Sequence, residues 1–143
     1  SVVEYYRGTQ IQVVVKRHPF CRSIKVQKCL DSLEASGEII RTDNSIHNLI
    51  KNSQIVLTVN SGVGLEALLH GKLVIVAGAC DYNYAAKVVK SCSELHEMLS
   101  GNTNPNHERI LELLYFYVHR FAIPANSVSR IKSRLDEWLQ PCN

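Results

Sequence analysis

Short apolar runs rich in β-branched residues alternate with amphipathic stretches over most of this chain. Each run, such as IQVVVK or LVIVA, has the length of a single strand and is bounded by turn-forming residues. The stretches between the runs carry apolar residues three or four positions apart, which is typical of helices. We expect strands at Ile11–Lys16, Glu38–Asp43, Gln54–Val59, Leu73–Ala77 and, shorter, Ala86–Val89.

Capping and stop residues bracket the helical stretches. Gly37 follows the first of them, Ser61 is placed as an N-cap, Gly71 as a C-terminal glycine, and Pro124 ends the long aromatic helix. We expect helices at Ser23–Ser36, Asn44–Asn52, Ser61–Gly71, Ser91–Gly101, His107–Phe121 and Ser127–Gln140.

The alternation of strands and helices predicts the α/β class, with a doubly wound parallel sheet followed by C-terminal helices. The strands are continuously apolar, as expected when helices cover both faces of a sheet. In such sheets, ligands bind beyond the carboxyl ends of the strands. If the first strand is central, the loops after the first and third strands meet at one edge.

Composition limits what the chain can be. Its 143 residues, 45% hydrophobic and 20% charged, suit one globular domain spanning residues 1–143. The formal net charge is only +3 and the Lys and Arg residues are scattered, so we expect no nucleic-acid partner. Neither a membrane-spanning run nor a signal peptide is evident. Five cysteines without a CxxC pair predict reduced thiols, no metal site and a cytoplasmic location.

The third strand runs into NSGVG, where small residues and a serine open a helix. The first turn of a helix leaves N–H groups unpaired, so an anion could come close to Gly62 and Gly64 while Ser61 adds a hydroxyl. Glu66, one turn on, could accept hydrogen bonds from a vicinal diol such as a ribose. Equally, Ser61 could only cap the helix, the glycines could allow tight packing, and Glu66 could face solvent.

The first strand ends in KRHPF, at the same predicted edge. His18 could donate to a phosphate or carboxylate, and Pro19 would stiffen the loop that holds it. The alternative is a turn histidine followed by a proline stop. Asp81 follows the fourth strand and could line the same pocket, or it could belong to a loop anchored by Tyr82 and Tyr84.

Three further features have a functional and a structural interpretation. Cys21 near His18 could be a nucleophile or an ordinary buried cysteine. The other histidines, His47 among them, share no ligand spacing and are interpreted as structural or surface residues. The aromatic stretch LLYFYVHRF (Leu113–Phe121) is either core or an interface with a partner domain.

VVVKRHP and the later segment IVLTVNSGVGLEALLHGKLVIVAG together resemble the C-terminal, donor-binding half of a GT-B glycosyltransferase. More narrowly, they resemble bacterial capsule polysaccharide biosynthesis and export proteins related to Kdo transferases. In that group a strand ending in Lys-x-His-Pro and a strand ending in Asn-Ser-x-x-Gly-x-Glu-Ala-Leu recur. YFYVHRFAIPANS is similar to the aromatic helix and turn that follow, so the likeness spans Ile11 to Ser127.

The resemblance implies a Rossmann-like half of a GT-B fold that binds a nucleotide-sugar donor, CMP-linked Kdo or a similar acidic sugar, without metal or other cofactor. His18 is implied to be catalytic, because a histidine and a helix N-terminus can offset the charge of the leaving phosphate. Asn60 and Ser61 match the motif that holds the phosphate, and Glu66 falls at the ribose position. The expected binding set is Lys16, His18, Pro19, Asn60, Ser61, Gly62, Gly64, Glu66 and Asp81.

The chain also departs from this pattern. Arg17 stands where relatives often have proline, which predicts a looser loop before His18, and Leu73 replaces the proline of Gly-Lys-Pro. A GT-B enzyme has two Rossmann-like halves, so the resemblance implies a longer parent whose missing N-terminal acceptor domain supplies the general base. The fragment alone is expected to be inactive, and the parent to be cytoplasmic with peripheral association to the inner membrane.

Two other functions are compatible with the residues. One is a nucleotide- or phosphate-binding module without transfer chemistry. The other is a half-domain of the nucleotide-sugar epimerase type, which shares the GT-B architecture.

Overall fold

The computed structural model describes residues 1–101, 103–121 and 126–138, and the chain divides into two compact units, Ser1–Pro105 and Asn106–Asn143. The first unit holds the strands, and the second is helical. In chain order the first unit contains α1 (Val2–Tyr6), β1 (Val14–Val15), α2 (Ile24–Ala35), β2 (Ile40–Arg41), α3 (Ile46–Asn52), β3 (Ile55–Thr58), α4 (Val63–Leu69), β4 (Leu73–Val76), β5 (Lys87–Val88) and α5 (Cys92–Ser100).

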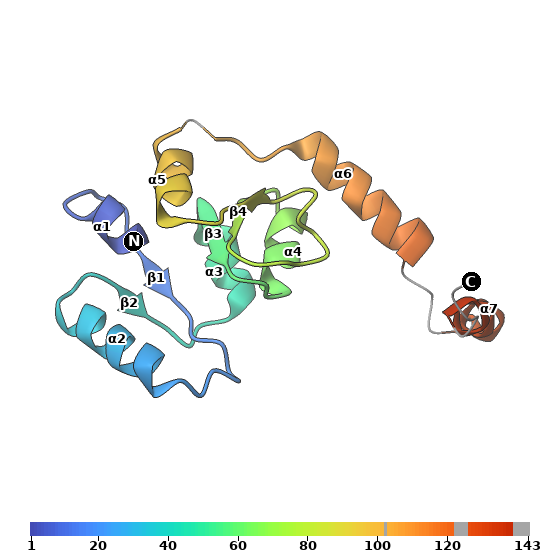
Figure 1. Cartoon of the computed structure of the whole chain (residues 1–143), viewed down its shortest axis with the longest axis horizontal. Helices are drawn as coiled ribbons and strands as arrows, with labels where there is room; N and C mark the ends of the chain where they lie inside the picture. The colour runs from blue at the N-terminus through green and yellow to red at the C-terminus, as the bar shows by residue number, and fades with distance from the viewer. Residues whose placement is uncertain (102, 122–125, 139–143) are drawn as a thin grey trace. The chain divides into compact units, whose positions relative to one another are not determined.

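The α/β class with parallel strand pairing is confirmed. Strand β1 pairs with β2, and β3, β4 and β5 pair in that order, all in parallel. The described strands therefore form two parallel sheets where the sequence analysis expects one, because no ladder joins β1 to β3. In Figure 1, β1 and β2 lie with α2, while β3 and β4 lie with α3 and α4.

Strand β4 lies at the centre of the larger sheet. All four of its residues are buried, and Val74, Ile75 and Val76 are at most 1% exposed. Helix α4 packs on both β3 and β4 and buries Ala67 and Leu68. The prediction of a strand covered on both faces is confirmed here, since a continuous apolar run has no face to present to water.

The same prediction is wrong for the first strand. Only Val14 and Val15 of the expected Ile11–Lys16 run pair with β2, and Val14 is 46% exposed. Its partner Ile40 is 47% exposed. Helix α2 runs beside this pair but contributes no buried side chain, so the small sheet lacks the cover that a fully buried strand requires.

Helix α1 has no counterpart in the sequence analysis. It has only five residues, and the ring of Tyr5 lies 5.7 Å from the ring of His96 on α5. Just after it, the Arg7 guanidinium pairs with the Glu38 carboxylate, which precedes β2. Short helices of this kind are stabilised by such tertiary contacts, so local periodicity does not reveal them.

The predicted helix-ending glycines Gly37 and Gly71 are confirmed. In the HGK segment, Gly71 ends α4 and Lys72 binds the neighbouring helix ends. Gly37 and Gly71 adopt φ values of +72° and +65°, a region that other residues rarely enter. After Gly71, the backbone of Lys72 donates to the Ala67 carbonyl at 3.0 Å. The Lys72 Nζ donates to the carbonyls of Lys51 and Ser53, each at 2.9 Å, and so binds the C-terminus of α3.

Tyr82, in the loop after β4, is the bulkiest of the fully buried side chains and packs directly on Gly64 of α4. A Cβ added at Gly64 would lie 2.6 Å from the Cε2 and Cζ atoms of the Tyr82 ring. The Tyr82 hydroxyl donates to the Ser61 carbonyl. Packing therefore requires a glycine at position 64. For Gly64 this supports the interpretation that the glycines of NSGVG allow tight packing, and not that they admit an anion.

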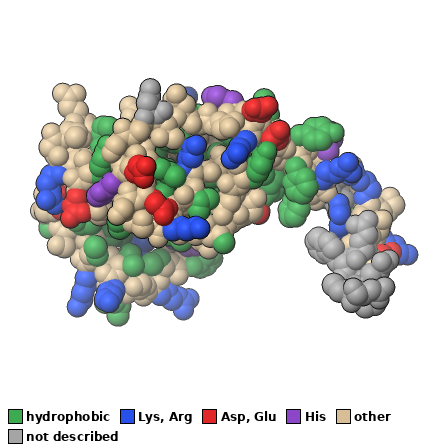
Figure 2. Space-filling view, turned by 45° about the horizontal axis from the view of Figure 1, so that its top comes forward, with side chains coloured by type: hydrophobic (Ala, Val, Ile, Leu, Met, Phe, Trp, Pro, Cys, Tyr) green, Lys and Arg blue, Asp and Glu red, His purple; other side chains and the backbone are tan. Residues whose placement is uncertain are grey.

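The second unit contains α6 (His107–Phe116), the π-helical turn η1 (Tyr117–Phe121) and α7 (Val128–Trp138). The expected continuous α-helix thus changes to π-type hydrogen bonding at Tyr117. Ile110 and Leu113 are buried, but Tyr115, Val118 and Phe121 are 55–64% exposed. Figure 2 shows hydrophobic side chains on the surface of this unit.

The interpretation of LLYFYVHRF as core is therefore wrong for most of its length, and the interface interpretation stays a prediction. The expected break at Pro124 lies outside the described residues. No helix within the described ranges combines the length and the apolar character needed to cross a bilayer.

We predict that Gly64→Ala destabilises the first unit by about 1–3 kcal/mol, because the methyl group overlaps the Tyr82 ring and the core around it is closed. Gly62→Ala is the matched control, since a Cβ there meets no atom within 4 Å. Chemical denaturation of both variants measures the difference. Equal losses at the two positions would contradict the packing role of Gly64.

Candidate functional site

Three side-chain contacts bring the loops after β1, β2, β3 and β4 toward one edge of the first unit. The Lys16 Nζ, at the end of β1, donates to the Asn44 carbonyl after β2 at 2.9 Å. His47, in the first turn of α3, lies 3.5 Å from the Glu66 carboxylate on α4. The Ser61–Tyr82 bond joins the loop after β3 to the loop after β4. This is the carboxyl edge, where parallel sheets bind ligands.

The loop after β1 presents His18 and Pro19 to solvent. The His18 Nδ1 accepts a hydrogen bond from the Phe20 backbone at 3.2 Å, and the two rings lie 5.7 Å apart. A further bond from the Cys21 N–H to the His18 carbonyl, at 2.9 Å, closes the turn. With Nδ1 accepting, the proton of a neutral ring sits on Nε2, which can donate to a ligand.

Arg17 organises this loop, so the expectation of a looser segment is wrong. Its guanidinium donates to the Cys21 carbonyl and to the Gln27 side chain on α2. These bonds hold the His18–Cys21 turn against α2 in the way that a proline would restrain it from within the backbone. The Arg17 Nε is also buried and has no hydrogen-bond partner among the described residues, so this part of the side chain lies inside the loop.

The same contacts act on Cys21, which is partly exposed. A hydrogen bond from the Ser23 backbone lowers the pKa of the Cys21 thiol, and the Arg17 guanidinium lowers this pKa further. The interpretation of Cys21 as an ordinary buried cysteine is therefore wrong. Its thiol stands in an electropositive turn, although no base within the described contacts marks it as a nucleophile.

The junction between β3 and α4 differs by one residue from the expectation. The N-cap is Gly62, with helical φ and ψ, and Ser61 lies before it. The Ser61 hydroxyl accepts only a long bond of 3.4 Å from the Val63 N–H. Asn60 and Gly62 are exposed, and the space beside Gly62 is open to 4 Å. A ligand can therefore approach the backbone at Gly62, but not at Gly64, which Tyr82 covers.

Glu66 points toward α3. Its Oε2 is shielded from solvent and has no hydrogen-bond partner among the described residues, while the side chain as a whole is 42% exposed. Neither sequence interpretation describes this arrangement, because the carboxylate is partly covered by His47. The closeness of His47 to Glu66 arises from the packing of two helices, so no sequence pattern predicts it.

The structure brings some of the expected residues together and leaves others apart. Asp81 is exposed and adjoins Tyr82, so it lies beside the Ser61 loop. Within the described contacts, His18 makes no hydrogen bond or ring contact with Asn60, Ser61 or Gly62. The edge thus offers a cation at Lys16, a donor at His18, and hydroxyl and carboxylate acceptors from α4 and its preceding loop.

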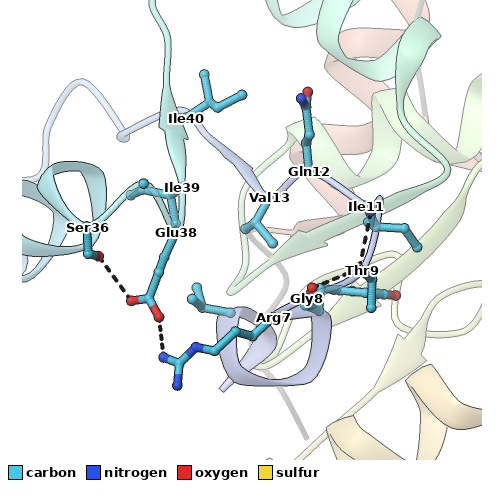
Figure 3. Close-up of a pocket in the computed structure, with 13 residues that line it drawn as sticks. Arg7, Gly8, Thr9, Ile11, Gln12, Val13, Ser36, Glu38, Ile39 and Ile40 are labelled. Atoms are coloured by element: carbon cyan, nitrogen blue, oxygen red, sulfur yellow. Dashed lines mark hydrogen bonds and ion pairs between the residues drawn. The ribbon is translucent and has the colours of Figure 1, made fainter.

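A cavity of about 490 Å³ lies at the opposite, amino-terminal ends of β1 and β2. Figure 3 shows the Arg7–Glu38 pair and the Ser36–Glu38 bond on its wall, with Ile40 and Val13 nearby. None of the expected site residues lines it. Because its charged groups are paired with each other, it carries no unmatched charge that would select an ionic ligand.

The described residues contain no cluster of three or more His, Cys, Asp or Glu side chains that could hold a metal ion. The cysteines in these residues, Cys21, Cys29, Cys80 and Cys92, are free thiols, and Cys142 lies outside them.

We predict that Arg17→Ala slows the labelling of Cys21 by iodoacetamide at pH 7 by about twofold or more. The thiolate is the reacting form, so loss of the guanidinium raises the pKa of this thiol and lowers the thiolate fraction. Mass spectrometry of labelled peptides gives the rate, with the exposed Cys29 as internal reference. An unchanged Cys21 rate would show that Arg17 does not act on the thiol.

Protein FixF of Sinorhizobium fredii (strain NBRC 101917 / NGR234) is 38% identical to this chain over 79 residues, which are 54% of this chain and 18% of FixF. The chain thus matches less than a fifth of that protein. No solved structure matches this chain significantly.

Residues 6–91 match the family described as capsule polysaccharide biosynthesis protein, which is more than half of the chain. The match contains β1 to β5 and every expected site residue. The chain therefore belongs to the capsule polysaccharide biosynthesis family.

Proposed function

We propose that this chain is the donor-binding part of a glycosyltransferase that builds a bacterial surface polysaccharide, with a CMP-linked acidic sugar such as Kdo as donor. Membership of the capsule polysaccharide biosynthesis family supports the pathway. The observation that carries the binding role is the convergence of the loops after β1, β2, β3 and β4 at one edge, through the Lys16, Glu66 and Tyr82 contacts.

The chemistry at this edge suits a nucleotide phosphate. Lys16 places its Nζ at the end of β1, and the exposed His18 can donate from Nε2. Gly62 has open space beside its backbone, and the Ser61 hydroxyl is held by only one long bond. Donors placed where a phosphate gains charge during glycosyl transfer lower the barrier for its departure.

In this proposal His18 stabilises the leaving phosphate, and Asn60, Ser61 and Gly62 line the phosphate path. Glu66 accepts hydrogen bonds from the ribose, and Asp81 lies at the rim. The acceptor site and the general base come from a further domain of the parent protein. The parent works in the cytoplasm, at the face of the inner membrane.

Two alternatives differ from this proposal in measurable ways. A phosphate-binding module without transfer chemistry would bind nucleotides but support no sugar transfer in the parent. An epimerase-type half-domain would prefer uridine nucleotides. The family match supports a role in surface polysaccharide biosynthesis, and nucleotide titrations separate the three candidates.

We predict that the chain binds CMP or CDP more tightly than UDP, because the donor is cytidine-linked. Isothermal titration calorimetry with the three nucleotides measures the order of affinity. A clear preference for UDP would support the epimerase-type alternative. Binding of none of the three would overturn the nucleotide-binding role.

We predict that Gly62→Val lowers CMP affinity at least about tenfold, because its side chain fills space that no protein atom occupies, while the poorer N-cap costs at most about 1 kcal/mol of stability. Ser61→Ala combined with His18→Ala is expected to abolish sugar transfer in the full-length parent. Lys28, an exposed residue of α2 outside the expected site, provides a control position in Lys28→Ala. Transfer that survives the double change would contradict the phosphate role.

A further inference from the structure

One oxygen of the Glu66 carboxylate is buried without a hydrogen-bond donor among the described residues. This oxygen is Oε2, and the Nδ1 of His47 lies 3.5 Å from it. A shielded carboxylate oxygen without a donor is costly, so the structure must offset that cost nearby. The His47 imidazole is the group in position to do so.

The other oxygen of Glu66 is available to a ligand. The side chain is 42% exposed although Oε2 is covered, which leaves Oε1 as the accessible acceptor. The His47 side chain is itself 70% exposed. The pair therefore stands at the surface with one carboxylate oxygen turned toward the protein and the other toward solvent.

The position of His47 joins this pair to the candidate site. His47 is in the first turn of α3, three residues after Asn44, whose carbonyl accepts the Lys16 Nζ at the end of β1. Glu66 lies in the first turn of α4, which begins at the open Gly62. The start of α3 is thus in contact with both the β1 loop and α4.

We propose that His47 is a positioning residue of the nucleotide site: it fixes the Glu66 carboxylate so that Oε1 accepts hydrogen bonds from the ribose hydroxyls. This inference rests on the proposed function and adds a residue and a selectivity to it. A carboxylate held in one orientation discriminates between a ribose and a 2′-deoxyribose, whereas a freely rotating one loses part of that preference to entropy.

The test compares CMP with 2′-deoxy-CMP by calorimetry. We expect the chain to prefer CMP by about tenfold, as for one hydrogen bond to a charged group. His47→Ala is expected to reduce the preference to about twofold, and Glu66→Gln to remove most of it. His47→Asn, whose side-chain amide offers a donor near the former Nδ1, is expected to restore it.

His70→Ala is the matched control, because His70 is an exposed histidine of the same unit, at the C-terminal end of α4. Loss of CMP preference in that variant as well would overturn the assignment of His47. Retained preference in His47→Ala, together with loss in Glu66→Gln, would overturn it while leaving the proposed function intact. Failure of the unaltered chain to bind either nucleotide would overturn both.

Discussion

The Tyr82 side chain holds together the two loops on which the candidate site is built. Its ring occupies the space above Gly64, and its hydroxyl binds the Ser61 carbonyl. Because Tyr82 is 1% exposed, this bond lies away from competing water. The contact fixes the start of α4 relative to the loop after β4, and it leaves Gly62 as the point where the backbone faces open space.

Helix α3 has a comparable role, although it has only seven residues. At its start lie Asn44, which binds Lys16, and His47, which faces Glu66. At its end, the Lys51 and Ser53 carbonyls accept the Lys72 ammonium group. Contacts from β1, from α4 and from the residue before β4 thus converge on α3, so the two sheets are linked through it without a shared ladder between β1 and β3.

These contacts separate structural from binding roles within one short motif. Gly64 and Lys72 are explained by packing and by helix termination. Gly62, Glu66 and the exposed His18 lie at the edge where parallel sheets bind ligands, and the space beside Gly62 is open. Recognition of a phosphate-bearing ligand needs an accessible backbone and nearby donors, which is why we propose such a ligand for this edge.

The sequence by itself determined the order and type of most elements, because strand and helix periodicities and glycine stops such as Gly71 are local properties. It also predicted that Lys16, Asn60 and Asp81 lie at or just after the ends of strands, and the structure has them after β1, β3 and β4. Tertiary structure decided the rest: that Val14 stays exposed, that Tyr82 covers Gly64, and that His47 meets Glu66. These depend on which segments pack together, and distances across helices leave no periodic signal in the chain.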